Sequence, residues 1–393
     1  MEAYGRVLRV PHVRWLLTTA LLARVPYGIE ALATVLFVHE QQGSFAAAGA
    51  VSAAGALAAG IGLPILGRLI DVLGQTRVLV AVSVVHLAAG AALVLLGEAG
   101  ASTAELAALA AVGGLAVPPI SPSLRSLWPG VLGDDPRMLR SALALDAISL
   151  EAAFIGGPLL TAALVELVSP GAALMTGFAV AAGGALSFAT AQPSRRWRGS
   201  GTASFGLGPL RSRGLRTLLV GAAPLGFAFG SLDVALPAFG VAEGSRGTGA
   251  ICVAALAVGS AICGVLYGAR PPARIARTYV VLSVLLPLGV LLLALPASLA
   301  AMVLLAPAAG AVLAPITAAA NELAGDVAPA GTVTEAYAWV ITSTIGGVAL
   351  GTAVAGAVVE GAGWREAIVV GAAGAAAGAA LVVARRGTLH ATP

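Results

Sequence analysis

The chain has 393 residues, of which 59% are hydrophobic and only 10% are charged. Soluble globular domains carry about 25% charged residues, so this composition excludes a protein that faces water on all sides and predicts one embedded in a lipid bilayer. All 22 basic residues are arginine, which excludes phosphate binding by a P-loop lysine and cofactor chemistry through a lysine Schiff base.

Metal, thiol and nucleic-acid chemistry also lack support in the sequence. Cys252 and Cys263 lie in one apolar run, ~16 Å apart along a helix, which is too far for a disulfide. The four histidines are scattered without metal-ligand spacing. The arginines are dispersed between apolar runs and do not form a basic polar domain. We therefore predict no metal, no cofactor, no nucleic-acid partner and no catalytic residue, and we expect that the protein is not an enzyme.

Twelve apolar runs approach the ~20 residues that a membrane-spanning helix requires. The first run follows three arginines, as a signal peptide would, but its 24 residues are too many for a signal sequence, so we interpret it as an uncleaved span. Short alternating segments are rare, which favours helices over a barrel. The predicted spans are 15–38, 45–66, 78–97, 104–127, 142–168, 172–191, 215–240, 248–267, 279–297, 299–323, 335–359 and 367–384.

The arginines orient these spans. If the N-terminus is cytoplasmic, nineteen arginines fall on cytoplasmic segments and only Arg246 and Arg365 fall on outer loops. This asymmetry is what the positive-inside rule predicts. The sequence therefore predicts twelve spans with both termini in the cytoplasm of a cell whose plasma (inner) membrane holds the protein.

The longest polar stretch, 192–216, divides the chain at its midpoint and is rich in Arg and Gly. We predict an N-terminal six-helix half at 1–191, a cytoplasmic linker at 192–214 and a C-terminal six-helix half at 215–393. The segments "PPISPSLRSL" (118–127) and "APITAAANEL" (314–323) match weakly across the halves. Parallel six-span repeats of this kind are a transporter architecture, with the substrate site between the halves near mid-membrane.

A loop motif makes the resemblance specific. The segment "GRLIDVLGQTR" (67–77) follows the second span, where Gly67, Asp71 and Gly74 match the signature Gly-x-x-x-Asp-Arg/Lys-x-Gly-Arg/Lys-Arg/Lys. With two six-helix halves and a central linker, the chain resembles the major facilitator superfamily. Val72, Gln75 and Thr76 depart from the signature, and its only following base is Arg77, one place late. The "GGP" at 156–158 is a weak match to the Gly-Pro signature of the family's antiporters.

The resemblance implies an all-α membrane protein with twelve transmembrane helices in two pseudo-symmetric six-helix bundles. It also implies secondary transport by alternating access, in a bacterial member rich in arginine and without lysine.

Two charges lie near the middle of their predicted spans. Arg24 and Glu151 are each ~14 Å along an outward-running helix, about midway through a ~30 Å apolar core. Charges at that depth are costly and indicate a functional site. We predict that Arg24 and Glu151 pair or together contact the substrate; the alternative is a purely structural ion pair.

Two acids lie farther along the first and seventh spans. Glu30 and Asp233 are ~22 Å and ~27 Å in, at nearly corresponding places of the two halves. We predict that they carry protons or attract a cationic substrate; the alternative is simple exposure at the outer mouth. His86, on the third span, is interpreted as a packed or bundle-facing histidine.

The prolines Pro118 and Pro119, with Pro122, should break the fourth span near its middle. A break frees backbone groups that can line a cavity, so Ser121 and Ser123 are predicted pocket residues.

At the cytoplasmic edge we predict a charge latch between the arginines of one half and the acids of the other. The family resemblance adds Asp71 as an anchoring charge near the start of the eleventh span, where "TVTE" (332–335) has the form of a capping box. The predicted gate residues are Gly67, Asp71, Gly74, Arg77, Arg125, Arg140, Asp146, Glu322 and Glu335.

The function we predict is proton-coupled efflux of a small organic or drug-like solute by a monomer in the lipid bilayer. The alternatives are a solute importer (symporter) and a non-transporting membrane receptor or scaffold on the same fold.

Overall fold

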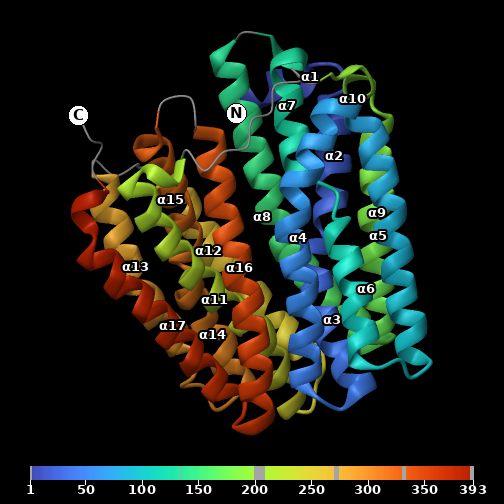
Figure 1. Ribbon diagram of the computed structural model, residues 1–393, viewed down its shortest axis with the longest axis vertical. Helices are drawn as coiled ribbons and strands as arrows, with labels where there is room; N and C mark the ends of the chain where they lie inside the picture. The colour runs from blue at the N-terminus through green and yellow to red at the C-terminus, as the bar shows by residue number, and fades with distance from the viewer. Residues whose placement is uncertain (1, 134, 199–208, 270–273, 330–332, 390–393) are drawn as a thin grey trace.

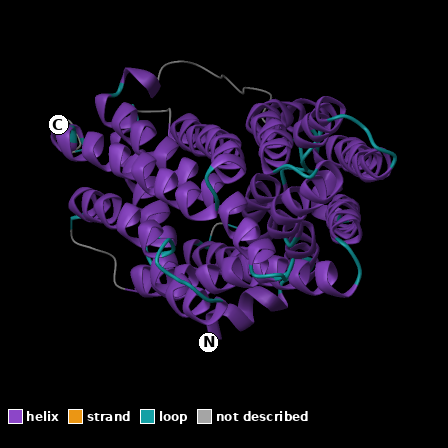
Figure 2. Ribbon diagram, turned by 90° about the horizontal axis from the view of Figure 1, so that it is seen from below, coloured by secondary structure: helices purple, strands orange, loops and turns teal. Residues whose placement is uncertain are grey.

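The computed structural model of this chain describes residues 2–133, 135–198, 209–269, 274–329 and 333–389. These residues form helices joined by turns, and no strand occurs among them (Figure 2). Twelve helical segments are long and apolar enough to cross a membrane, which confirms the predicted number of spans. They are arranged as two bundles that stand side by side (Figure 1).

The N-terminal bundle contains the first six spans, two of them divided into shorter helices. A short helix precedes the first span, and another follows the sixth. The helices are α1 (Glu2–Arg9), α2 (Val13–Arg24), α3 (Pro26–Gln42), α4 (Phe45–Leu73), α5 (Gln75–Glu98), α6 (Thr103–Leu115), α7 (Ile120–Leu132), α8 (Pro136–Leu167), α9 (Pro170–Thr190) and α10 (Gln192–Arg196).

The C-terminal bundle contains the other six spans, and its fourth span is also divided. Short 3₁₀ turns lie before its first helix and after its last. The helices are η1 (Pro209–Arg211), α11 (Arg213–Ala242), α12 (Thr248–Ala269), α13 (Ile275–Leu292), α14 (Leu299–Gly310), α15 (Leu313–Val327), α16 (Val333–Gly361), α17 (Trp364–Ala384) and η2 (Arg386–Thr388).

Three spans are interrupted within the membrane. The predicted break at Pro118 and Pro119 is confirmed, because α6 ends at Leu115 and α7 begins at Ile120. Pro26 begins α3 directly after α2, where its missing N–H and fixed φ interrupt the helix. The division between α14 and α15, at 311–312, is the counterpart of the α6–α7 break in the other bundle.

Within the described part of the chain, serine hydroxyls cap the N-termini of five helices. Each serine side chain accepts a hydrogen bond from the backbone N–H three residues ahead, so one otherwise unpaired donor is satisfied. At Ser102 the Glu105 carboxylate also reaches back to the Ser102 N–H, which completes a capping box. The capping residues are Ser44, Ser102, Ser169, Ser212 and Ser298.

In the C-terminal bundle, α11 and α16 pack backbone against backbone. A Cβ on Gly226 would overlap the carbonyl of Thr344, and one on Gly347 would overlap that of Ala223. Gly230 faces Val348 in the same way one turn farther on. Small residues at such a contact let two backbones touch directly, which is how helices associate where the hydrophobic effect is absent.

Across the two bundles, α4 packs along α16 and α8 packs along α12. Gly49 of α4 lies against the backbone of α16: a Cβ built there would be 2.6 Å from the Thr352 carbonyl oxygen and 3.0 Å from the Gly356 Cα. Farther along α4, a Cβ on Gly60 would be 2.9 Å from the Ile345 side chain. Near the other end of α4, Gly67 has nothing within 4 Å.

Polar contacts join the bundles at the same end as Gly49, near the start of α4. The Glu166 carboxylate accepts hydrogen bonds from the Ser245 hydroxyl and the Gly247 N–H, both at 2.6 Å. Arg246 and Glu40 form an ion pair at 2.8 Å. We call these residues, together with the Phe45 N–H and Glu360 carboxylate that bond at 2.8 Å, the interbundle latch.

Candidate functional site

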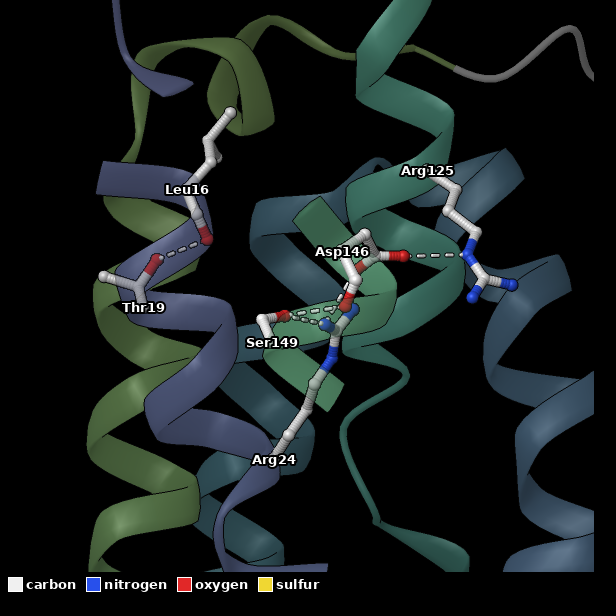
Figure 3. A network of polar contacts seen from close by, with 6 residues as sticks. All are labelled: Leu16, Thr19, Arg24, Arg125, Asp146 and Ser149. Carbon is white, nitrogen blue, oxygen red and sulfur yellow. Dashed lines mark hydrogen bonds and ion pairs between the residues drawn. The ribbon is translucent and has the colours of Figure 1, made fainter. Parts of the chain in front are cut away.

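A buried charge network lies inside the N-terminal bundle (Figure 3). Arg24, the last residue of α2, points toward α8, where its Nη1 donates to Asp146 Oδ1 at 2.6 Å and to Ser149 Oγ at 3.1 Å. The other oxygen of Asp146 accepts from Arg125 Nε of α7 at 3.0 Å. One carboxylate is therefore shared by two guanidinium groups from separate helices.

Burial differs sharply among these three side chains. The side chains of Arg24 and Asp146 expose 1% and 2% of their surface, whereas that of Arg125 exposes 55%. Two arginines and one aspartate leave one excess positive charge. Nε and Nη2 of Arg24 are also buried and find no acceptor in the part of the chain that is described. The guanidinium thus keeps the capacity to bind another acceptor, such as water or a polar group of a solute.

The carboxylate beside Arg24 is therefore that of Asp146, and the predicted Arg24–Glu151 pairing is corrected. The two acids are five residues apart on α8, which places them about 140° apart around a helix of 3.6 residues per turn. Ser149 is three residues from Asp146 and shares its face, so both reach Arg24. Depth along a helix does not specify which face an acid occupies.

Glu151 and Asp233 are partly buried carboxylates with no hydrogen bond or ion pair among the described residues. Glu151 lies ~15 Å from the start of its span at Ser141, and Asp233 lies ~14 Å from the end of α11 at Ala242. Both are at depths where an unpaired charge is costly and indicates function.

Glu30 has a partner that the sequence did not reveal. Its Oε1 lies 3.2 Å from Nε2 of His86, on α5. The other ring nitrogen of His86, Nδ1, lies 2.9 Å from the carbonyl oxygen of Gly113, the residue two positions before the end of α6. His86 is buried, as expected for a packed histidine, and its ring forms a T-shaped contact with the Phe178 ring, with the centroids 4.9 Å apart.

The two predicted pocket serines differ in burial. Ser123 is buried on α7, its carbonyl accepts from Gln75 Nε2 at 3.0 Å, and its hydroxyl has no partner among the described residues. Ser121, at the start of α7 directly after the break, is only partly buried. Their membership of a solute pathway stays a prediction.

The segment that carries the family motif is mostly helical, and the chain turns only at Gly74. Gly67 lies inside α4, and only Gly74 has a positive φ, +87°, between α4 and α5. Gln75 is fully buried, and its amide donates to Ser123 O and Ser126 Oγ of α7. The departure from the signature at this position therefore ties the start of α5 to α7 by neutral hydrogen bonds.

The predicted charge latch between the two halves stays a prediction. Arg125 contacts Asp146 of its own bundle and not an acid of the other bundle. Glu322 is exposed on α15, Arg77 is exposed on α5 and Asp71 is partly buried at the end of α4. The side chains of Arg140 and Glu335, and with them the capping box at 332–335, lie outside the described residues.

Among the residues that the structure describes, no group of three or more His, Cys, Asp or Glu side chains is arranged to hold a metal ion.

The same arrangement of helices occurs in solved transporters. A mutant of the nucleoside transporter NupG has a TM-score of 0.78 and 15% sequence identity, over 95% of this chain and 99% of that one. A POT family peptide transporter in complex with sulfate has a TM-score of 0.74 and 15% identity, over 98% and 96% of the two chains. The human organic anion transporter MFSD10 has a TM-score of 0.61 and 19% identity, over 94% and 98%.

No protein-family model and no curated protein sequence matches the chain. The similarity is thus one of fold, extending over nearly the whole length of each protein. The predicted fold class, two pseudo-symmetric six-helix bundles of the major facilitator type, is confirmed. The chain has the fold of multi-pass membrane transporters.

Proposed function

We propose that this protein is a secondary transporter that moves a small organic solute across the plasma membrane by alternating access, as an efflux protein coupled to protons. The observation that carries the proposal is the set of ionisable side chains at mid-membrane depth. Among them, Nε and Nη2 of Arg24 can still donate hydrogen bonds to a ligand. A receptor or scaffold on this fold would have no need for unpaired carboxylates at Glu151 and Asp233.

Alternating access requires that the bundles close at one end while the other end admits solute. The interbundle latch and the contact of Gly49 with α16 supply such a closed end. By the distribution of arginines we assign this end to the outside, so that the structure corresponds to a state closed to the exterior. The family signature loop, Arg125 and Glu322 then lie on the cytoplasmic side.

The solute class follows from chemistry that the site offers and from what the similar transporters carry. Their names describe nucleoside, peptide and organic anion transport. An excess positive charge around Asp146 favours solutes with acceptor groups, such as carboxylates, carbonyls or ribose hydroxyls. Nucleosides, short peptides and organic anions are therefore the first probes to use.

The test is a transport screen of the purified monomer in proteoliposomes. Each probe class is offered with no gradient, with an imposed pH gradient and with an imposed membrane potential. We expect transport of at least one class, accelerated when the pH gradient drives protons against the solute. Asp233→Asn and Glu151→Gln should each slow transport roughly tenfold, because a group in the solute or proton pathway is lost.

The matched control is Glu243→Gln, which neutralises an exposed acid just after α11. It should transport at the wild-type rate. If no probe class moved in any gradient, or if neutralising both membrane acids left transport unchanged, the proposal would be wrong. Acceleration by a pH gradient of the same direction as the solute would instead assign the protein as an importer.

A further inference from the structure

The contact between His86 and Glu30 fixes where protons must be. Nδ1 of His86 lies 2.9 Å from the Gly113 carbonyl oxygen, which can only accept a hydrogen bond. Nδ1 must therefore carry a hydrogen. In a neutral imidazole the second nitrogen, Nε2, is then an acceptor with a free lone pair.

Nε2 lies 3.2 Å from Glu30 Oε1, and an ionised carboxylate is also purely an acceptor. Two acceptors at that distance repel each other, so the contact needs one hydrogen between them. Either Nε2 carries it, as an imidazolium beside a carboxylate, or Oε1 carries it, as a carboxylic acid beside a neutral imidazole. In both cases the pair binds one proton more than a neutral His86 and an ionised Glu30 would bind.

We propose that His86 and Glu30 together form the proton-carrying site of this transporter, binding one proton between Nε2 and Oε1 in this conformation and releasing it in another. The inference rests on the proposed function, since a carried proton matters only if solute movement is coupled to it. The reaction is a simple transfer: the shared hydrogen leaves as a proton to water, and the pair is left as Nδ1–H imidazole and carboxylate.

Access and depth suit this role. His86 is the twelfth residue of α5, ~17 Å from its start, and so near mid-membrane. Its side chain exposes 3% of its surface, whereas that of Glu30 exposes 21%. Because α3 packs against α4, α8, α9 and α11, the exposed part of Glu30 belongs to an interior helix of the protein. Glu30 is therefore the member of the pair through which a proton can enter or leave.

Few other charges surround the pair. On α3, Tyr27 lies one turn before Glu30, and Arg24, at the end of α2, is engaged by Asp146. The helix α9, which packs on both partners, has no titratable residue, and α6 has only Glu105, which its own Ser102 holds. The remaining ionisable groups that the structure describes on α3, α5 and the helices packed against them are His39 and Glu40 of α3, Arg77 and Glu98 of α5, Arg14 of α2, Arg68 and Asp71 of α4, Glu151 and Glu166 of α8, Arg195 and Arg196 of α10, and Arg213, Arg216 and Asp233 of α11. The side chains of Arg137 and Arg140 of α8 lie outside the described residues.

The first test needs no solute. Full-length protein with ¹⁵N-labelled histidine is reconstituted in lipid nanodiscs, and the His86 signals are identified by their loss in His86→Asn. We expect Nδ1 to be protonated throughout. As rising pH removes the shared proton, Nε2 should lose either its own hydrogen or the hydrogen bond that it accepts from Glu30. In Glu30→Gln the amide donates to Nε2, so His86 should remain a neutral Nδ1–H imidazole over the whole range.

The control is Glu151→Gln, which removes a membrane acid that has no described contact with His86 and should leave its titration unchanged. A wild-type His86 without a hydrogen on Nδ1 would overturn the proposal. So would a His86 that loses its proton at the same pH in Glu30→Gln as in the wild type. Neither result depends on whether a transported solute has been found.

The second test uses a probe that the transport screen identifies. In proteoliposomes, Glu30→Gln and His86→Asn should retain exchange of labelled for unlabelled probe but lose roughly tenfold or more of the pH-gradient-driven flux. Gradient-driven flux that survives in both variants would refute the assigned site while leaving the transport function intact. A wild type that transports without responding to any pH gradient would instead refute the coupling.

Discussion

Arg24 Nη1 and Asp146 Oδ1 lie 2.6 Å apart, and neither side chain exposes more than 2% of its surface. This contact joins α2 to α8 inside the N-terminal bundle, and Arg125 attaches α7 to the same carboxylate. About three turns farther along α8, Gly157 packs against the Val25 carbonyl, and Pro158 packs against Gly28. The "GGP" motif thus packs α8 closely against the start of α3.

Asp146→Asn should destabilise the protein strongly. The substitution leaves Arg24 buried without a counter-charge, and breaking a buried pair in this way costs about 3–5 kcal/mol. Arg125→Gln is the matched comparison, because Arg125 contacts the same carboxylate from an exposed position, where an ion pair contributes at most ~1 kcal/mol. Thermal unfolding in detergent measures both. Equal losses of stability in the two variants would contradict the difference in burial.

Gly49→Val should weaken the closed end of the molecule. A Cβ at Gly49 would lie 2.6 Å from the Thr352 carbonyl oxygen, and backbone cannot move aside as a flexible side chain can. Overpacking of this kind costs about 1–3 kcal/mol, enough to shift the two conformations by roughly tenfold toward the one open at this end. Gly67→Val, on the same helix with nothing within 4 Å, is the control.

The measurement is the distance between spin labels at residues 41 and 243, with Cys252 and Cys263 replaced by alanine. Gly49→Val should increase the population of longer distances, and Gly67→Val should reproduce the parent distribution. An unchanged distribution in Gly49→Val would show that this contact does not control closure.

Glu166→Ala should loosen the interbundle latch. The Gly247 N–H loses its acceptor, and a hydrogen bond to an exposed carboxylate contributes about 1 kcal/mol, so exchange of this amide should accelerate roughly fivefold. Hydrogen–deuterium exchange of the segment from 243 to 251 measures the effect. Glu243→Ala, an exposed acid without this contact, should exchange like the wild type; similar acceleration in both would point to a general loss of order instead.

The family signature has basic residues where this chain has Val72 and Gln75. Restoring them should change the stability of the protein little at position 72 and lower it at position 75. Val72→Arg places the new charge on a side chain that is 74% exposed, so stability should change little. Gln75→Arg buries a guanidinium where Gln75 now has no exposed surface and donates to α7, which should cost about 3 kcal/mol or more. Unfolding curves of the two variants decide this, and a well-tolerated Gln75→Arg would contradict the buried position.

The sequence predicted the number of spans and the Pro118–Pro119 break because both depend on local properties: the length of apolar runs and the missing N–H of proline. It did not predict the division at 311–312, where neither residue is a proline. Glycine contacts also have no local signature. Gly49 and Gly67 occupy the same helix, and only the position of α16 makes them different.

At the candidate site, too, local properties could be predicted from the sequence, whereas contacts between helices could not. The depth expected for Arg24 came from a count along the helix, but choosing Asp146 over Glu151 needed the angular position on α8 and its rotation toward α2. The spacing of Asp146 and Ser149 was the one local signal available. The contact of Glu30 with His86 joins residues 56 apart in the sequence and depends on how α3 and α5 are rotated in the bundle. No spacing rule contains that information.

The glycine contact between α11 and α16 has a mechanical consequence. The two helices touch through Gly226, Gly230 and Gly347, each of which lies directly against a backbone carbonyl of the other helix. Because no layer of side chains separates them, they cannot slide easily past each other and should move as one rigid unit. The 29 residues of α16 make a helix ~44 Å long, and the same helix contacts α4 at Gly49. When α11 and α16 rotate together about the Gly49 contact, the end of α16 farthest from Gly49 therefore moves the most. That end lies at the opposite face of the membrane.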